Sequence, residues 1–270
     1  MSTILPGRRV PIQVWANPDE IEAQALAQLT NVSALPWAFH HVAAMADCHF
    51  GIGATVGSVI AMQGAVCPAA VGVDLSCGMA AIKTSLRTED LPESLKKLRS
   101  SFERSVPVGF HSHKEPLALI LDTGGQYAKL WKGFSTLTPE VQRLLPRAQQ
   151  QMGTLGGGNH FIELCLDTGG SVWLMLHSGS RNIGKELAEI HIERARKLAH
   201  NQDLPDRDLA VFIADTPQMA SYRNDLYWAQ DYAYLNRLTM LTLLQKDLRH
   251  AFKGKRITFE EPILCHHNYV

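Results

Sequence analysis

A glycine-rich loop followed by a β-hairpin, with a histidine at each end, most constrains how this chain folds. Glycines cluster at residues 153–158, and residues 161–167 and 171–176 read as two strands joined by a short turn. Antiparallel strands joined by a tight turn bring their far ends side by side. We therefore expect His160 and His177 to lie at the same edge of the hairpin, an arrangement that suits a metal or phosphate site.

The remaining chain reads as a mixture of strands and helices. Strands are expected at 9–16, 39–45, 55–62, 65–73, 79–86 and 255–259. Helices are expected from Asn17, at 90–105, at 138–151, at 183–200 and from 216 to 248. The aromatics of the last helix recur at helical spacing and predict a core stripe rather than a base-stacking platform: Tyr222, Tyr227, Trp228, Tyr232 and Tyr234. The pattern predicts one α+β domain, 1–270, with a mixed, largely antiparallel β core and helical insertions.

Net charge and composition limit the kinds of partner and cellular compartment that we expect for this protein. Formal net charge is +0, so a general attraction for nucleic acid is not expected, and phosphate binding must come from a local cluster. The chain has no apolar run of about 18 residues and no apolar stretch typical of a signal peptide, so neither a membrane span nor secretion is predicted. An odd count of 5 cysteines predicts reduced thiols and a cytoplasmic protein.

A turn containing Asp74 and Cys77 follows one expected strand. It can offer a carboxylate and a thiolate from adjacent backbone, and a thiolate can bridge two cations while imidazoles complete their ligand shells. Mixed sulfur, nitrogen and oxygen ligands suit transition metals more than magnesium or calcium. The alternative stays open at this point, since Cys77 can equally be a buried thiol and His160 a hydrogen-bonded core histidine.

Three further polar segments also lie next to glycines or at strand ends. The sequence Ser178-Gly179-Ser180-Arg181 precedes an expected helix and reads either as an anion site or as a simple helix cap. Asp47 with His49, and the segment 266–268, offer more ligand-type side chains. The pair His111 and His113 lies in an expected loop and is interpreted as incidental.

Taken together, five ordered segments resemble the RtcB family of RNA-splicing ligases. They are Met45-Ala46-Asp47-Cys48-His49-Phe50-Gly51, Val71-Gly72-Val73-Asp74-Leu75-Ser76-Cys77-Gly78, Gly153-Thr154-Leu155-Gly156-Gly157-Gly158-Asn159-His160-Phe161-Ile162-Glu163, Leu176-His177-Ser178-Gly179-Ser180-Arg181 and Cys265-His266-His267-Asn268-Tyr269. Their common order along most of the chain is far more specific than any single motif.

The resemblance implies a role for each site residue. A cysteine bridges two divalent metals in this family, usually Mn2+, with Zn or Co possible in a structure, and the role falls on Cys77. The other implied metal ligands are Asp74, His160, His177 and His267. The implied nucleotide-binding residues are Asn159, His160, Phe161, Ile162, Glu163, His267 and Asn268. The implied phosphate or RNA contacts are Ser178, Ser180 and Arg181.

The resemblance also implies a reaction. Family members join RNA that ends in a 2′,3′-cyclic phosphate or 3′-phosphate to RNA with a 5′-hydroxyl. GTP first guanylylates a histidine, and the GMP then passes to the RNA 3′-phosphate. GTP, Mn2+ and RNA ends are therefore the expected cofactors and partners.

One departure from the family pattern concerns the nucleophile. Family members continue beyond the His-His-Asn-Tyr motif, and the guanylylated histidine lies in that portion, for which this sequence offers no counterpart. We therefore expect an incomplete ligase whose catalytic nucleophile is not assigned. The alternatives are a metal-dependent cyclic phosphodiesterase or phosphohydrolase that does not ligate, and a non-catalytic metal- and phosphate-binding module.

Overall fold

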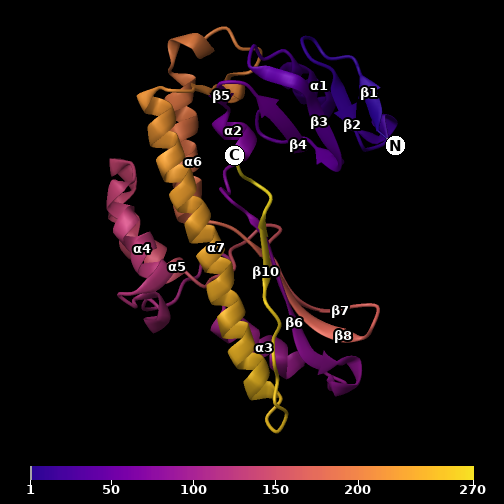
Figure 1. Cartoon of the computed structure of the whole chain (residues 1–270), viewed down its shortest axis with the longest axis vertical. Helices are drawn as coiled ribbons and strands as arrows, with labels where there is room; N and C mark the ends of the chain where they lie inside the picture. Colours follow the sequence, from indigo (N-terminus) through magenta and orange to yellow (C-terminus); the bar gives the residue numbers. More distant parts are fainter. Residues whose placement is uncertain (1) are drawn as a thin grey trace. The chain divides into compact units, whose positions relative to one another are not determined.

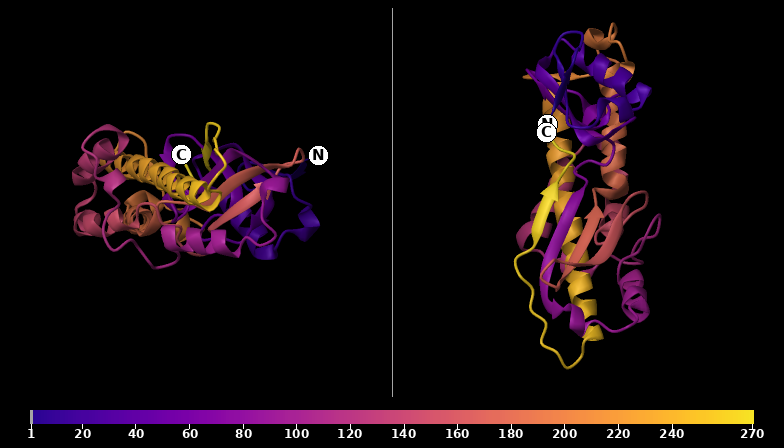
Figure 2. Two further views of the ribbon diagram at one scale, coloured as in Figure 1. Left: turned by 90° about the horizontal axis from the view of Figure 1, so that it is seen from below. Right: turned by 90° about the vertical axis from the view of Figure 1, so that its right-hand side faces the viewer.

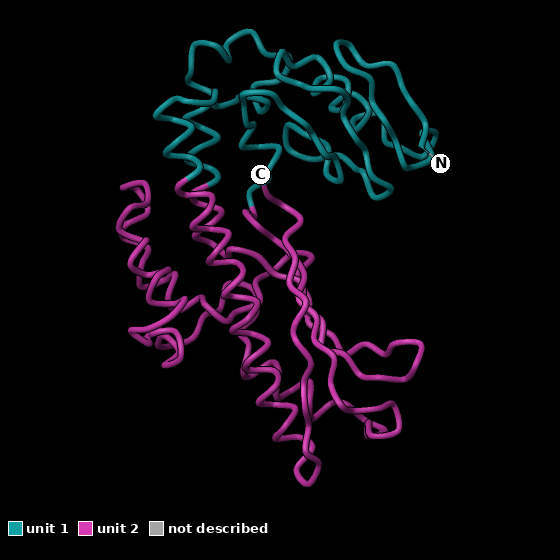
Figure 3. The backbone as a smooth tube through the Cα atoms, in the orientation of Figure 1, with its two compact units in different colours: residues 1–73, 188–223, 270 teal, residues 74–187, 224–269 magenta. Residues whose placement is uncertain are grey.

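The structure is a computed structural model that describes residues 2–270. It contains both helices and sheets, and the predicted α+β class is confirmed (Figure 1). Its residues group into two compact units (Figure 3). The first comprises the chain up to Val73, Ala188–Arg223 and Val270, and the second comprises Asp74–Leu187 and Asn224–Tyr269. That 1–270 forms one domain stays a prediction.

A four-stranded sheet forms the centre of the first unit. Its strands lie in the order β1 (Thr3–Leu5), β2 (Ile12–Val14), β3 (Ala38–His49) and β4 (Val56–Met62). The β2–β3 pair is parallel and the other two pairs are antiparallel. Helix α1 (Ala23–Ser33) connects β2 to β3, and its buried residues Leu29 and Val32 join Ile12 and Val14 in the core.

Two sequence-based boundaries in this unit were wrong. Asn17 caps only a 3-10 turn, Pro18–Glu20, and α1 begins at Ala23. The segment 65–73 is not one strand, because β5 (Ala65–Val66) is followed by the short helix α2 (Pro68–Val71). Proline lacks a backbone N–H for a strand ladder and favours the first turn of a helix. Strand β5 pairs instead with β9 (Phe212–Ile213).

An antiparallel four-stranded sheet organises the second unit. Its strands lie in the order β10 (Ile263–His266), β6 (Gly78–Arg87), β8 (Ser171–Ser178) and β7 (Phe161–Leu166). The predicted hairpin is confirmed as β7 and β8, whose register places Phe161 opposite His177. The strand expected at 255–259 was wrong. There, Ile257 is buried in the core cluster and only Phe259 makes a single bridge, to Thr84.

Two α-helices of the second unit begin later in the sequence than predicted. The helical segments of this unit comprise 3-10 turns at Thr88–Asp90, Ala118–Ile120, Phe134–Thr136 and Pro139–Leu144, and helices α3 (Lys96–Ser105), α4 (Gly125–Gly133) and α5 (Leu145–Gln151). The starts predicted at Asp90 and Thr138 therefore fall on 3-10 turns rather than α-helices.

Two long helices have residues in both units. They are α6 (Arg181–Arg196) and α7 (Pro217–Ala251), and further 3-10 turns lie at Ala199–Asn201 and Arg207–Leu209. Of the aromatics of α7, Tyr222, Trp228 and Tyr232 are buried as predicted, whereas Tyr227 and Tyr234 are exposed. Among residues 2–270, no helix combines the length and apolar character needed to span a membrane.

One face of the second sheet packs on α7. Met240, Leu241 and Leu244 form a core cluster with Ile82 and Leu174 of the central strands. Figure 2 shows the strands running alongside this part of the helix. Because strand side chains alternate between faces, Phe161, Glu163 and His177 lie on the face away from α7. The packed face fixes the register, and so it fixes which side chains reach the strand ends.

Candidate metal centre

The ends of four neighbouring strands, β10, β6, β8 and β7, bring the predicted ligands together in the second unit. Gly78 is paired with Ser178 on β8 and with His266 on β10, so Cys77 and His267 each lie one residue beyond the ladder. The N–H of His267 donates to the carbonyl of Cys77 at 2.9 Å and extends the pairing by one step. Residues that are far apart in the sequence thus converge at one edge of the sheet.

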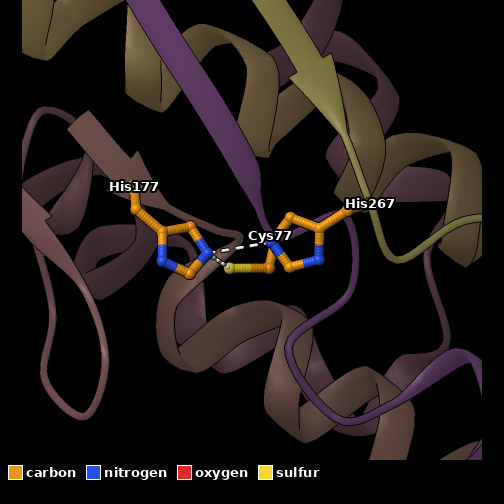
Figure 4. Close-up of side chains that lie close together, drawn as sticks. All are labelled: Cys77, His177 and His267. Carbon is orange, nitrogen blue, oxygen red and sulfur yellow. Dashed lines mark hydrogen bonds between the residues drawn. The ribbon is translucent and has the colours of Figure 1, made fainter. Parts of the chain in front are cut away.

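Cys77, His177 and His267 point toward one another (Figure 4). The Cys77 Sγ lies 3.1 Å from Nε2 of His177, and the Nε2 atoms of His177 and His267 are 2.9 Å apart. Cys77 and His177 are buried, whereas His267 is exposed. This first group therefore combines two buried side chains with one exposed side chain, His267.

A second group of donor atoms shares the same cysteine. His160 Nε2 lies 3.3 Å from Cys77 Sγ and 2.9 Å from Oδ2 of Asp74. In each group the ligand atoms all lie within 4.8 Å of one another. Cys77 therefore stands between two sets of donors, the position of a bridging thiolate.

Hydrogen bonds on the outer side of each imidazole determine which nitrogen faces the centre. His160 Nδ1 lies 2.9 Å from the carbonyl of Leu155, and His177 Nδ1 lies 3.3 Å from the carbonyl of Asn159. A carbonyl only accepts, so each Nδ1 must carry the proton, and in the neutral ring Nε2 then presents a lone pair. Partners of this kind orient metal-binding histidines.

His267 follows the same pattern, and the inward lone pairs then require a cation or a proton. Its Nδ1 lies 3.0 Å from the side-chain oxygen of Asn268. Two lone pairs 2.9 Å apart, at His177 and His267, repel each other unless a positive charge lies between them. The same holds for His160 Nε2 and the Asp74 oxygen. The donor set of thiolate, imidazole and carboxylate therefore fits transition-metal ions.

Burial acts on the protonation of these ligands. Burial lowers the pKa of His177, which favours the neutral, ligating ring. Burial, with the negative charge of Asp74 adding to it, raises the pKa of the Cys77 thiol. A metal ion must therefore displace a proton from Cys77 before the sulfur can ligate.

Asp74 is held in place by the turn that precedes α6. Its Oδ1 accepts from the backbone N–H of Ser180 at 3.1 Å and from the Ser180 hydroxyl at 3.3 Å. Gly179 is essential to this approach, since a Cβ there would lie 2.2 Å from Asp74 Oδ1. Burial raises the pKa of Asp74, but the hydrogen bond and charge of a protonated His160, with hydrogen bonds from Cys77 and the Ser180 backbone, outweigh it and leave that pKa lowered.

The predicted phosphate contacts lie beside the candidate metal ligands, and several of their polar groups already make hydrogen bonds within the protein. The Ser178 hydroxyl donates to the carbonyl of Leu155, and the Ser180 hydroxyl donates to Asp74. Arg181 adopts a φ of +58°, uncommon for a non-glycine residue, and its guanidinium donates to Thr154 and to the carbonyl of Gly109. Their role with phosphate stays a prediction, and their bonds give these serines a structural role as well.

The predicted nucleotide residues occupy several positions around the same edge. Asn159 is exposed, Phe161 packs edge-on against His177, and Glu163 is exposed further along the same strand. Ile162 packs in the core cluster on the opposite face. Asn268 donates to the carbonyl of Asp74 at 3.3 Å, linking the end of the chain to the metal turn. Nucleotide binding by these residues stays a prediction.

Among the described residues of the second unit, no other histidine or carboxylate belongs to these donor groups. Asp47 and His49 belong to the first unit. In the second unit, His113 lies 3.2 Å from the carbonyl of Gly153, and His111 is exposed in the loop. His266 faces Arg237 rather than the ligand atoms, with its Nδ1 2.9 Å from the guanidinium.

Sequence reasoning missed two buried polar residues of α7 that support the centre. Asn236 accepts from the N–H of Gly153 at 2.7 Å and donates to the carbonyls of Thr154 and Gly179. Arg237 donates to backbone carbonyls near the ligands. Both side chains are 0% exposed. An Asn-Arg pair inside an otherwise apolar helical stripe was the available signal, because buried polar groups need partners.

The geometry defines an α+β protein with two candidate metal-binding groups that share one thiol. Comparison with known proteins then identifies the family of this chain. The family model for the tRNA-splicing ligase RtcB matches residues 28–270, and the chain belongs to that family. Its relatives carry the names of RNA ligases, so the family is one of enzymes.

Individual relatives show how much of their length is matched. The chain is 40% identical over 282 residues to RNA-splicing ligase RtcB of Escherichia coli K12, covering 99% of this chain and 69% of the relative. It is 27% identical over 302 residues to tRNA-splicing ligase RtcB of Methanococcus maripaludis, covering 95% and 62%. For the Aeropyrum pernix relative the values are 28% over 296 residues, 92% and 61%. The chain thus spans about two thirds of these relatives.

Proposed function

We propose that this chain is an RNA ligase of the RtcB type. The reaction joins an RNA 2′,3′-cyclic phosphate or 3′-phosphate end to a 5′-hydroxyl end, with GTP and Mn2+ as cofactors, in the cytoplasm. The observation that carries the proposal is the arrangement of two donor groups around Cys77 in a member of this family. Phosphoryl chemistry at RNA ends needs positive charge near the phosphate, and this donor set fits ions that supply it.

Each donor group has a defined part in this proposal. Asp74 and His160 would hold one ion with Cys77, and His177 and His267 would hold the other with the same sulfur. When bound, two such ions neutralise phosphate charge and align the attacking and leaving oxygens. The carbonyls of Leu155 and Asn159 keep the imidazoles in the ligating tautomer. Zinc or cobalt is expected to occupy the same donors in place of manganese.

The nucleotide and RNA contacts extend outward from the metals. We assign the guanosine nucleotide to the surroundings of Asn159, Phe161, Glu163 and Asn268, with Ile162 contributing from within the same strand. The exposure of Asn159 and Glu163 beside the donor groups supports this assignment. Arg181, with Ser178 and Ser180, is assigned to phosphate. The positive charge of its guanidinium, and the bond of its neighbour Ser180 to the candidate ligand Asp74, support that role.

Guanylylation is the step that most sharply tests the ligase assignment. The nucleophilic histidine implied by the resemblance is not assigned to any residue of this sequence, which covers 69% of the Escherichia coli relative. Incubation with labelled GTP and Mn2+ therefore asks where GMP attaches. A covalent adduct on these 270 residues requires a nucleophilic side chain within them. Absence of an adduct, with both metals bound, restricts the chain to the metal and RNA part of the reaction.

Cyclic-phosphate opening is a second candidate function, favoured by one observation. All five donor residues lie between Asp74 and His267, so both candidate metal groups are contained in the chain. A metal-activated water can open a 2′,3′-cyclic phosphate without a guanylylated histidine. Release of linear 3′-phosphate that is abolished by Cys77→Ala supports this candidate.

A non-catalytic metal- and phosphate-binding module is the remaining alternative. Metal analysis of the purified protein, combined with assays of ligation and cyclic-phosphate opening, separates the three candidates. Metal bound with neither ligation nor cyclic-phosphate opening indicates the binding module. No bound metal after reconstitution with Mn2+, Zn2+ or Co2+ contradicts the assignment of the donor groups themselves.

A further inference from the structure

Arg237 is one of the largest fully buried side chains of the structure, at 0% exposed. It lies on α7, and its guanidinium makes its hydrogen bonds to two backbone carbonyls and one imidazole rather than to a carboxylate. Burying a guanidinium is costly unless its donors are well satisfied. Even so, its Nε atom has no hydrogen-bond partner. The groups that Arg237 bonds offer an explanation for burying so costly a side chain.

The three groups that Arg237 bonds each adjoin a candidate metal ligand. Its Nη1 donates at 2.9 Å to the carbonyl of Ser76, which precedes Cys77. The same nitrogen donates at 2.9 Å to the carbonyl of Ser178, which follows His177. Its Nη2 lies 2.9 Å from Nδ1 of His266, the neighbour of His267.

These contacts lie at the end of the sheet, where one backbone hydrogen bond, from His267 to the carbonyl of Cys77, remains beyond the last paired row. The last paired row of the ladder is Ser178, Gly78 and His266. Two of the ligands, Cys77 and His267, lie just outside that row. A rigid planar fork that bonds the adjoining residues of all three strands can hold the ligands in register where the ladder ends.

We propose that Arg237 is a positioning residue of the metal centre, because it joins the ligand-bearing ends of β6, β8 and β10 through one guanidinium. The proposal rests on the metal centre of the proposed function. It predicts that a change at Arg237 alters metal affinity, although Arg237 bonds only to residues that are next in sequence to the candidate ligands. Outer-shell partners of this kind typically change metal affinity about 10- to 100-fold.

The experiment compares Arg237→Lys and Arg237→Met with the unchanged protein by Co2+ titration. Cobalt bound by a thiolate gives charge-transfer and d–d absorption bands that report the ligand geometry. Both variants are expected to bind Co2+ about 10- to 100-fold more weakly and to show altered d–d bands. Lysine keeps the charge but not the fork, so Arg237→Lys is expected to resemble Arg237→Met. Arg249→Lys and Arg249→Met, at an exposed position of the same helix, are the matched controls.

A milder variant keeps the test decisive if the Arg237 variants fold poorly. His266→Phe removes the Nη2 contact and the 3.3 Å contact of His266 Nδ1 with the Ser76 carbonyl, and it leaves the hydrogen bonds of Arg237 to both carbonyls. It is expected to weaken the group containing His267 about tenfold while leaving the group of Asp74 and His160 unchanged. Folding of each variant is monitored by far-ultraviolet circular dichroism.

The outcomes separate this inference from the proposed function. If the unchanged protein shows no thiolate–cobalt bands, the metal centre itself is refuted. If it shows them, and folded Arg237 variants and His266→Phe give the same affinity and bands, Arg237 is only a structural residue and the inference is overturned.

Discussion

The Nε2 atoms of His177 and His267 lie 2.9 Å apart, although the two residues are 90 positions apart in the sequence. Each ring has its Nδ1 engaged by an oxygen acceptor, so both neutral rings direct a lone pair into the same space. Such an arrangement is stable when a cation occupies that space, and Cys77 Sγ completes the donor set. Metal binding at this edge of the sheet should therefore depend on each of these donors.

Removal of Cys77 is expected to affect both metal groups at once. Cys77→Ala should weaken binding of both ions by more than about 100-fold, beyond the range typical of removing an outer-shell partner, because the sulfur is shared. Metal content after dialysis, measured by plasma mass spectrometry, checks this result. Cys165→Ala is the control, since Cys165 contacts Glu163 rather than the donor atoms. Loss of only one ion from Cys77→Ala would contradict a bridging role.

Metal binding is expected to strengthen as the pH rises. Burial raises the pKa of the Cys77 thiol, so at neutral pH the metal must displace its proton. Below that raised pKa, apparent affinity should increase about tenfold per pH unit for each proton released. Calorimetry in buffers of different ionisation enthalpy counts the protons. Cys77→Ala should release about one proton fewer, and an unchanged proton count would refute the thiol as the source.

Substitution of Gly179 is expected to disturb one metal group selectively. A Cβ at Gly179 would lie 2.2 Å from Asp74 Oδ1, so Gly179→Ala must displace the carboxylate. Binding of the ion assigned to Asp74 and His160 should weaken about 10- to 100-fold, whereas the other ion should be retained. Gly157→Ala is the matched control, because the nearest atom to its Cβ is 3.8 Å away. Equal loss of both ions, or of neither, would count against the assignment.

The hairpin that carries His160 and His177 is expected to lose stability in acid. The pKa of Asp167 is lowered to about 2 by hydrogen bonds from the Trp173 side chain and the Ser171 backbone. Its folded pKa lies below the unfolded value, so its stabilisation is present above pH about 4 and is lost as the pH falls toward 2. The difference in unfolding free energy between the unchanged protein and Asp167→Asn should shrink over that window. A difference that does not depend on pH would refute the role of this carboxylate.

Local patterns in the sequence were enough to predict the hairpin and the ligand candidates. The glycine-containing turn and the two flanking strands determine their own register, so the chain's local pattern alone places His160 and His177 at one edge. The turn from Asp74 to Cys77 could likewise be recognised as a source of two candidate ligands, since its residues are neighbours. The ordered motifs were sufficient to identify the family.

Only the tertiary structure decided how distant segments meet. Cys77 reaches His160 across 83 positions and His177 across 100, because β6 pairs with β8, and periodicity within a strand does not specify its partner. The same limit explains why residues 255–259 were misassigned and why the role of Arg237 could not be inferred from its position in the sequence. The error at 65–73 was local, because Pro68 favours the first turn of a helix over a strand. The sequence determined which residues can ligate. Long-range strand pairing and burial against α7 decided which of them stand within bonding distance of a common centre.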